Sequence, residues 1–517
     1  MRKIISVFLS AILCMTAVTA FAQADEPKAG GILQIGVTQL TTNVGYSPDQ
    51  SSNSIMKFAR SAYNSLLNYD PAGVLIGELA TAWEQDAQAK TITYHLRDGV
   101  VFSDGTPFNA EAVKWNIEQY VAFGRTEVAG IASIECPDDL TVVITLDTWN
   151  GSKLESIGFF VYYMSPAAIE ANGKDWAYTN TCGTGPFVLE TIVEGSSIAY
   201  AKNPLYWEAG KPYLDGVKFN YFADSTTLSY ALQNKEIDMV FDTPAAVVLE
   251  YQNADGYYIS KNANGQGYES LGVIADNASE YHADGSVNPF YYPLVRKALN
   301  YALDKDALCE IMTEGLGTPT NQWATQDAST YSPNVVANEY NPEKAKELLA
   351  EAGFADGFTT TIYNVSGYFD DACALIQAYL ADVGITVNIQ NEDVTTLTGR
   401  MYNGWEGLYW HWATITPDLG LYMGRHLDPA GAYYAGYIQH PDDAVALLNS
   451  IRTASTPEEK QSLSWQLQEL IYNDYALFGS VIYTNCIKMV CSDYVKDGGF
   501  GASHASVWSP ANCWLDK

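Results

Sequence analysis

Glu78-Leu-Ala-Thr-Ala-Trp-Glu84 begins the stretch from which the fold is inferred. It is followed by Thr91-Ile-Thr-Tyr-His-Leu-Arg97 and then by Ser103-Asp-Gly-Thr-Pro-Phe108. The middle segment alternates polar and apolar residues, which predicts a β-strand with one buried face. The segments on either side predict a turn and a turn-rich loop. Asn109 predicts the N-cap of a helix that begins at Ala110. The stretch therefore predicts turn, strand, loop and helix in succession.

Aromatic residues concentrate in a second stretch, Trp405-Glu-Gly-Leu-Tyr-Trp-His-Trp-Ala-Thr-Ile-Thr-Pro-Asp418. In a strand, alternate side chains share a face. One face is then predicted to carry Leu408, Trp410, Trp412 and Thr414, and the other Tyr409, His411 and Ala413. A buried core strand is one interpretation of this strip, and the wall of a ligand cleft is the other.

Length and composition limit the class of protein. The 517 residues exceed what one hydrophobic core usually serves, so two or three lobes are expected. Hydrophobic residues make up 47% of the chain, enough for packed cores. The formal net charge of −32 repels nucleic acid and anionic lipid, which disfavours both as partners.

The first residues have the features of a secretory signal. Arg2 and Lys3 precede a largely apolar run, and Ala20-Phe-Ala22 provides a cleavage pattern before Gln23. Residues 1–22 are therefore expected to be removed, and the protein is expected to be periplasmic, or at the cell surface or extracellular. Cys14 raises the alternative of a lipid anchor, which Leu13 disfavours because a small residue normally stands at that position. No later run is apolar enough to cross a membrane.

The cysteines fit no zinc-binding spacing. Without Cys14, seven remain: Cys136, Cys182, Cys309, Cys373, Cys486, Cys491 and Cys513. Their pairing is open, with a Cys486–Cys491 bridge and buried free thiols as the alternatives. The six histidines show no metal-binding spacing, so neither a metal nor a cofactor is predicted.

Other segments give local predictions. Gly31–Val37 predicts a strand that ends in a polar loop, and Ser54–Leu67 predicts a helix. Asn341 predicts the cap of a helix that starts at Pro342 and ends at Gly353, and Thr456 the cap of a helix over Pro457–Tyr472.

A resemblance to a family rests on blocks that occur in a fixed order. The pattern over Glu78–Val113 resembles the family 5 bacterial extracellular solute-binding proteins, which include oligopeptide, dipeptide and nickel receptors of ABC importers. Further blocks are similar to the same family: Gly183-Thr-Gly-Pro-Phe187, Lys202-Asn-Pro-Leu-Tyr-Trp207, Asn234-Lys-Glu-Ile-Asp238, Val295–Asp304 and Tyr340–Gly353. Gly183 and Gly185 are expected to adopt backbone angles that a side chain would forbid.

The resemblance implies an α/β fold of the type II periplasmic-binding-protein class in its large three-lobed form. Two lobes would close over a cleft, with an extra inserted domain. By analogy, the first lobe is expected to combine residues 23–66, 188–285 and 490–517. The inserted domain would span 67–187 and the third lobe 286–489.

The resemblance also implies where ligand is held. Residues after the tryptophan at position 412 would pair with a peptide through Ala413 and Thr414, and an Asp at position 415 would bind its free amino end. Position 415 is Ile, so this anchor is missing, and Asp418 is the nearest substitute. The expected ligand contacts are Thr42, Asn43, Gly45, Tyr46, Trp323, Trp410, His411, Trp412, Ala413, Thr414, Ile415 and Asp418.

Function follows as an expectation. The chain is expected to be a monomeric substrate-binding protein that delivers a small solute to the permease of an ABC importer. Peptides or peptide-like compounds rank first, oligosaccharides second and nickel chelates third; for His411, a chelate ligand and a packed side chain are the alternatives. A sensor for a membrane receptor and a secreted hydrolase are the rivals. No Gly-x-Ser-x-Gly, Walker or dinucleotide-binding motif supports an enzyme.

Overall fold

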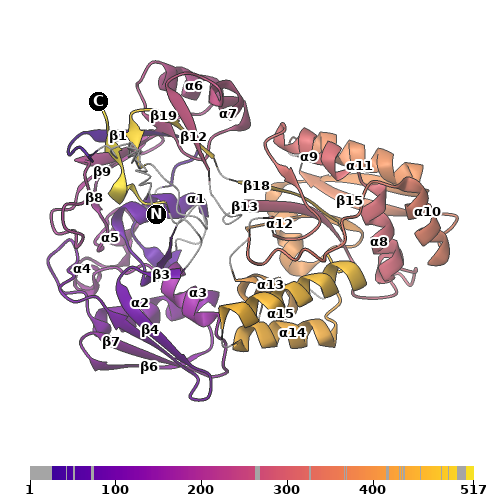
Figure 1. Cartoon of the computed structure of the whole chain (residues 1–517), viewed down its shortest axis with the longest axis horizontal. Coiled ribbons are helices and arrows are strands. Elements are labelled where there is room, and N and C mark those ends of the chain that lie inside the picture. The colour runs from indigo at the N-terminus through magenta and orange to yellow at the C-terminus, as the bar shows by residue number, and fades with distance from the viewer. Residues whose placement is uncertain are drawn as a thin grey trace, which may run out of the picture.

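The computed structural model places three larger sheets and their helices in two lobes that meet along one side (Figure 1). It describes residues 26–41, 43–49, 53–70, 75–261, 268–324, 326, 328–365, 367, 369–414, 418–429, 431, 433–434, 437–454, 456–478, 480–486, 488–497 and 508–517. The predicted signal segment and Cys14 lie outside these residues. None of the described helices has the length and apolar character needed to cross a membrane.

The first lobe is built on a seven-stranded sheet of order β12-β19-β11-β1-β10-β9-β8. Its strands are β1 (Ile32–Val37), β8 (Phe187–Val193), β9 (Ser197–Lys202), β10 (Gly216–Tyr221), β11 (Met239–Val240), β12 (Tyr257–Lys261) and β19 (Lys488–Ser492). β1 pairs in parallel with β10 and β11, and the other pairs are antiparallel. Its helices are α1 (Asn53–Ala62), α6 (Ser225–Gln233) and α7 (Ala245–Tyr251). The strand predicted at Gly31–Val37 is therefore the centre of this sheet.

A smaller antiparallel sheet of order β4-β5-β7-β6 joins the same lobe. It consists of β4 (Ala80–Asp86), β5 (Thr91–Leu96), β6 (Ile131–Asp138) and β7 (Thr141–Leu146), and β2 (Leu67–Tyr69) and β3 (Leu75–Gly77) pair beside it. Its helices are α2 (Ala110–Phe123), α3 (Lys153–Phe160), α4 (Pro166–Asn172) and α5 (Lys174–Tyr178). The Asn109 side chain accepts a hydrogen bond from the Ala112 backbone N–H, which confirms the predicted cap.

The second lobe is built on a six-stranded sheet of order β14-β18-β13-β17-β15-β16. Its strands are β13 (Tyr268–Ala275), β14 (Thr318–Pro319), β15 (Phe358–Val365), β16 (Ile385–Glu392), β17 (Leu408–Thr414) and β18 (Ser480–Cys486). Its helices are α8 (Pro293–Ala302), α9 (Lys305–Thr313), α10 (Pro342–Glu351), α11 (Asp370–Asp382), α12 (Val394–Asn403), α13 (Leu419–Leu427), α14 (Asp442–Thr453) and α15 (Pro457–Glu469). Two apolar clusters, one on each face, hold the helices to the sheet.

The chain passes between the two large sheets at two neighbouring points. β12 pairs with β19 as far as Lys261 and Lys488, and β13 pairs with β18 from Tyr268 and Cys486 onwards. The strand pairing thus places residues 268–275 with the second lobe. The lobe boundary expected near residue 285 stays a prediction, and the strand pairing shows that β13 belongs to the second sheet and not to the first.

Gly183 and Gly185 serve a different purpose from the one expected. Neither has a positive φ. A Cβ on Gly183 would lie 2.2 Å from the carbonyl oxygen of Ala62, and one on Gly185 would lie 2.5 Å from the backbone nitrogen of Tyr63. These glycines therefore allow the chain to pass directly against the end of α1.

Two predicted segments have different limits. α1 ends at Ala62 and not at Leu67, because the backbone N–H and hydroxyl of Ser65 both donate to the Glu78 carboxylate and draw the chain out of the helix. Part of the segment predicted as a turn is strand β4, which the sequence pattern missed because most of its residues are exposed. The caps at Asn341 and Thr456 are confirmed.

The described cysteine side chains are free thiols. Five of them are buried: Cys182, Cys309, Cys373, Cys491 and Cys513. Because Cys491 is among them, the alternative of a Cys486–Cys491 bridge is not observed. Within the described residues, no group of three or more His, Cys, Asp or Glu side chains is arranged to hold a metal ion.

Candidate functional site

Strand β17 has the alternating faces that its sequence predicts. Leu408 and Trp410 belong to the apolar cluster under α8 and α11, whereas Tyr409 belongs to the cluster on the opposite face. His411 lies on the same side as Tyr409, against α13. The two faces of β17 thus pack in two different surroundings.

Trp410 is part of the core. Its indole is fully buried, stacks on Phe369 with ring centroids 4.8 Å apart, and donates from Nε1 to the Cys373 Sγ at 3.2 Å. In this structure the ring has no exposed surface for a ligand, so Trp410 fits the interpretation of a buried core strand.

The opposite face of β17 leads into a cluster of rings that we call the aromatic box. It comprises Trp323, His411, Tyr422, His426, Tyr433 and Phe478. Trp323 stacks on His411 at 4.7 Å and on Phe478 at 5.3 Å, as measured between ring centroids. The structure therefore brings together two of the predicted contact residues, Trp323 and His411, from distant parts of the chain.

The box contains polar atoms in apolar surroundings. Burial, helped by the charge of Arg425, lowers the pKa of His411 to about 3, and burial also lowers the pKa of His426 well below its usual value. Both imidazoles are therefore neutral at pH 7. Both ring nitrogens of His426 and the Nε1 of Trp323 are buried without a hydrogen-bond partner among the described residues. Trp323 and His411 are 1% and 2% exposed, so in this structure neither ring presents a surface to a ligand.

Asp418 is already engaged within the protein. Its carboxylate caps α13 by accepting from the Leu421 backbone N–H at 3.2 Å, and its other oxygen lies 2.6 Å from the Lys460 Nζ. Asp418 is 1% exposed. Asp418, the nearest substitute for the missing anchor at position 415, is thus paired with Lys460 within the protein.

The N-terminal loop packs against helix α5 of the same lobe. Gly45 is buried, and its carbonyl accepts from the Tyr63 hydroxyl at 2.9 Å. Tyr46 is buried against Tyr178 and beneath the Lys174 ammonium. Asn43 donates from its side-chain amide to Asp49 at 3.0 Å. Thr42 lies outside the described residues.

The end of β17 has one paired and one open edge. On one side, Trp412, Ala413 and Thr414 pair antiparallel with β13. On the other side, β15 pairs with β17 only at Ile362 and Leu408, so within the described residues no strand covers Tyr409–Thr414 there. Ile415 lies outside the described residues.

Several residues of this region were not predicted from the sequence. Tyr422 and His426 are four residues apart on α13, a spacing that places both on one helix face and was available as a signal. Phe478 and Tyr433 carry no such signal, because only the fold brings them to His411.

Comparison with known proteins gives the family. Residues 74–434 match the family described as bacterial extracellular solute-binding proteins, family 5 Middle. The glutathione-binding protein GsiB of Pectobacterium atrosepticum is 29% identical over 493 residues, covering 89% of this chain and 90% of that protein.

Solved structures share the fold. The periplasmic binding protein DppA of Helicobacter pylori, in complex with the peptide STSA, superposes with a TM-score of 0.74 at 24% identity, covering 95% of this chain and 99% of that one. HbpA2 of Haemophilus parasuis superposes with a TM-score of 0.81 at 19% identity, covering 94% and 100%. The fold is thus the α/β fold of the type II periplasmic binding proteins, as expected. With most of its length matched in order, this chain belongs to the family 5 bacterial extracellular solute-binding proteins.

Proposed function

We propose that this solute-binding protein captures a short peptide or peptide-like compound and delivers it to the permease of an ABC importer. The observation that carries the proposal is that no described strand pairs with this edge of β17 beyond Leu408. Tyr409, Trp410 and His411 are buried, so the ligand is proposed to lie along the end of the strand, from Trp412 onwards. An extended ligand that lies along this edge gains main-chain hydrogen bonds as an added strand does. Each such bond contributes about 1 kcal/mol net.

The surroundings of that edge favour a ligand recognised by more than its amino group. Asp418 is neutralised by Lys460, so its carboxylate is not available to a ligand ammonium. The aromatic box beside the strand adds no charge, because its histidines are buried and neutral. Trp412, Ala413, Thr414 and Ile415 remain the proposed contacts on the strand, with the loop at 42–46 as the proposed contact from the first lobe.

The relatives support this class of solute. GsiB is described as binding glutathione, a tripeptide, and the DppA structure contains a tetrapeptide. The family description is extracellular, which supports an exported protein, periplasmic or at the cell surface.

Isothermal titration of the mature chain tests the proposal. The ligands are glutathione, the tetrapeptide Ser-Thr-Ser-Ala, its N-acetylated form, a maltotetraose control and a nickel chelate. We expect one of the peptide ligands to bind with a Kd of about 10 μM or tighter, and N-acetylation to weaken binding less than about tenfold, about 1.4 kcal/mol. Binding of only the sugar or the chelate, or of none of the five, would overturn the proposal.

A further inference from the structure

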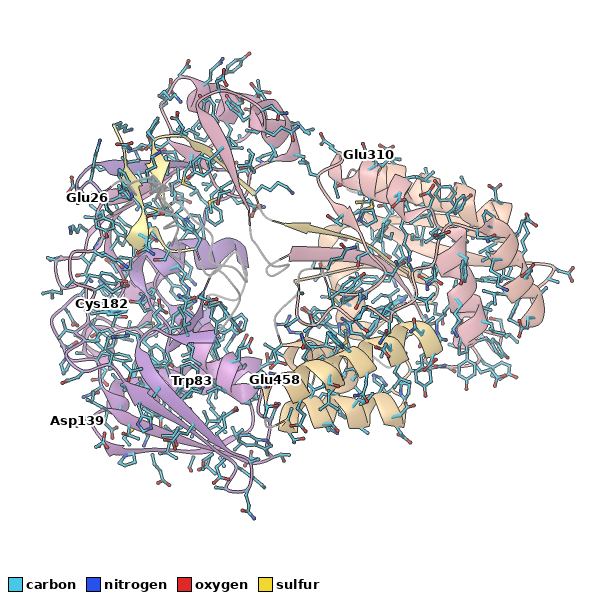
Figure 2. All side chains as sticks on the ribbon, viewed as in Figure 1. Glu26, Trp83, Asp139, Cys182, Glu310 and Glu458 are labelled. Atoms are coloured by element: carbon cyan, nitrogen blue, oxygen red, sulfur yellow. The ribbon has the colours of Figure 1, made fainter. Side chains whose placement is uncertain are left out.

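A pocket of about 440 Å³ lies between α2, the start of α4 and the loop before α2. This volume is within the range of pockets that hold small molecules. The residues that line it all fall from position 106 to position 167, so neither β17 nor the second lobe takes part. The Ala110 backbone N–H at the start of α2 donates to the Asp139 carbonyl, and Figure 2 labels Asp139 in the half of the first lobe that lies farther from the second lobe. The pocket is therefore separate from the proposed solute site.

One wall of the pocket is the outer face of α2. Trp115 stands at its centre, with Glu111 one turn before it and Glu118 one turn after it, a spacing that places the three side chains on one helix face. Trp115 is partly buried and packs against the core of the first lobe. Both glutamates are exposed. A molecule in the pocket thus meets a fixed indole that is flanked by two carboxylates.

The opposite wall is held in place by hydrogen bonds. The Asp104 carboxylate accepts from the Thr106 hydroxyl at 2.5 Å and from the Ser165 hydroxyl at 2.6 Å, which ties the loop before α2 to the start of α4. The residues that follow these two hydroxyls in the chain, Pro107 and Pro166, both line the pocket. Their rings fix φ, so this wall is ordered before a ligand arrives and binding costs little conformational entropy there.

We propose that this pocket is a second binding site, for a small organic amine whose ammonium group is attached to an apolar ring. The ring lies between Trp115 and the two proline rings. The ammonium group pairs with Glu111 or Glu118, beside an indole that attracts cations through its ring. This inference depends neither on the proposed function nor on the identity of the solute.

The charges of the lining favour an organic cation over an anion or a bare metal ion. Glu111 and Glu118 contribute two negative charges and Lys114 one positive charge, which leaves one negative charge in excess. Within the described residues, Lys114 forms no ion pair with either glutamate. The two glutamates are seven residues apart in the sequence, which is about 10 Å along the helix axis, so they do not hold one metal ion together.

Isothermal titration of the mature chain with tryptamine and with indole-3-propionate tests the site, because these probes share a ring and differ in the sign of the charged end. We expect tryptamine to bind with a Kd of about 100 μM and indole-3-propionate to bind at least about tenfold more weakly. The double variant Glu111→Gln, Glu118→Gln is expected to weaken tryptamine binding about tenfold. The control, Glu343→Gln with Glu347→Gln, removes the same charge from an exposed face of α10 and is expected to leave it unchanged.

A variant that fills the pocket gives a second test. Ala167→Phe places a ring in the pocket, whereas Ala171→Phe, one turn later on α4, lies outside the lining, and both alanines are exposed. Ala167→Phe is expected to weaken tryptamine binding about tenfold and Ala171→Phe to leave it unchanged.

Circular dichroism checks that each variant is folded, and the double glutamine variant decides alone if Ala167→Phe does not fold. Three results would overturn the site: no binding of tryptamine up to about 1 mM, equal binding of the two probes, or equal weakening by the two double variants, which would indicate attraction to the acidic chain as a whole. Because no peptide is present, the outcome is independent of the titration that tests the proposed function.

Discussion

Trp323 and His411 stack face to face, with ring centroids 4.7 Å apart and planes 10° from parallel. The loop that carries Trp323 is fixed by a hydrogen bond from its backbone N–H to the Tyr472 hydroxyl at 3.2 Å. His411 comes from β17, the strand whose open edge we propose to bind ligand. The stack therefore couples the end of that strand to the helices around it.

The aromatic box is expected to weaken in acid. His411 has a pKa of about 3 in the folded chain and an ordinary value of 6.5. Its contribution to the free energy of unfolding is therefore complete above pH 6.5 and is lost as the pH falls towards 3. At pH 5 the loss is at most about 2 kcal/mol. In urea unfolding at pH 7 and pH 5, we expect His411→Phe to lose less free energy of unfolding between these pH values than the wild type. Equal losses would show that His411 does not titrate as inferred.

Trp412 remains the strongest predicted ligand contact. Trp412→Ala is expected to abolish solute binding in titration, while the melting temperature without ligand stays within a few degrees. Trp410→Ala provides the contrast, because removing this core ring is expected to cost about 3–5 kcal/mol of unfolding free energy. A large loss of stability in Trp412→Ala would instead place its ring in the core.

Gly45 fixes the position of the N-terminal loop. A Cβ there would lie 1.8 Å from the Asn180 carbonyl oxygen and 2.1 Å from that of Ala177. We therefore expect Gly45→Ala to lower the unfolding free energy by about 2 kcal/mol. Gly399→Ala on α12 is the control, since a Cβ there would lie 3.9 Å from the side-chain nitrogen of Asn403, and it is expected to stabilise by up to about 1 kcal/mol. Chemical denaturation checks both, and equal effects would contradict the packing argument.

Glu78 accounts for part of the sequence pattern at Glu78–Val113. Its carboxylate accepts hydrogen bonds from the side chains of Arg60 and Asn64 and from Ser65. Because Arg60 is 1% exposed, removing its counter-charge leaves a buried cation, and Glu78→Ala is expected to cost about 3–5 kcal/mol.

Glu343→Ala is the matched control for that substitution. Glu343 pairs with Lys346 at 2.8 Å on an exposed helix face, so its loss is expected to change the unfolding free energy by less than about 0.5 kcal/mol. A mild effect of Glu78→Ala in the same denaturation series would show that Arg60 finds another partner.

Local features were predictable from the sequence because their causes are local. Asn109 and Asn341 cap helices whose first residues they hydrogen-bond, and the alternation along β17 needed only strand geometry. Alternation along β17 did not show what each face of the strand packs against. Trp410 lies in the core because α11 supplies Phe369 and Cys373, and nothing near Trp410 in the sequence indicates that contact.

The contacts between lobes were beyond local reasoning. The Gly151 backbone N–H donates to the Arg452 carbonyl at 2.7 Å, and no pattern near either residue indicates that these distant parts of the chain meet. The roles of Gly183 and Gly185 depend in the same way on a backbone more than a hundred residues earlier in the chain. The order of the sequence blocks nevertheless gave the family, because a family pattern records such long-range requirements indirectly.

The two neighbouring crossings between the sheets limit how the lobes can move. β12 and β19 end beside each other, and β13 and β18 begin beside each other, so both connections between the large sheets start from one place along the lobe boundary. Figure 1 places these crossings at the opposite end of the lobe boundary from the Gly151–Arg452 contact. The hydrogen bond from the Gly151 backbone N–H to the Arg452 carbonyl therefore resists a rotation of one lobe with more torque than the same bond would beside the crossings.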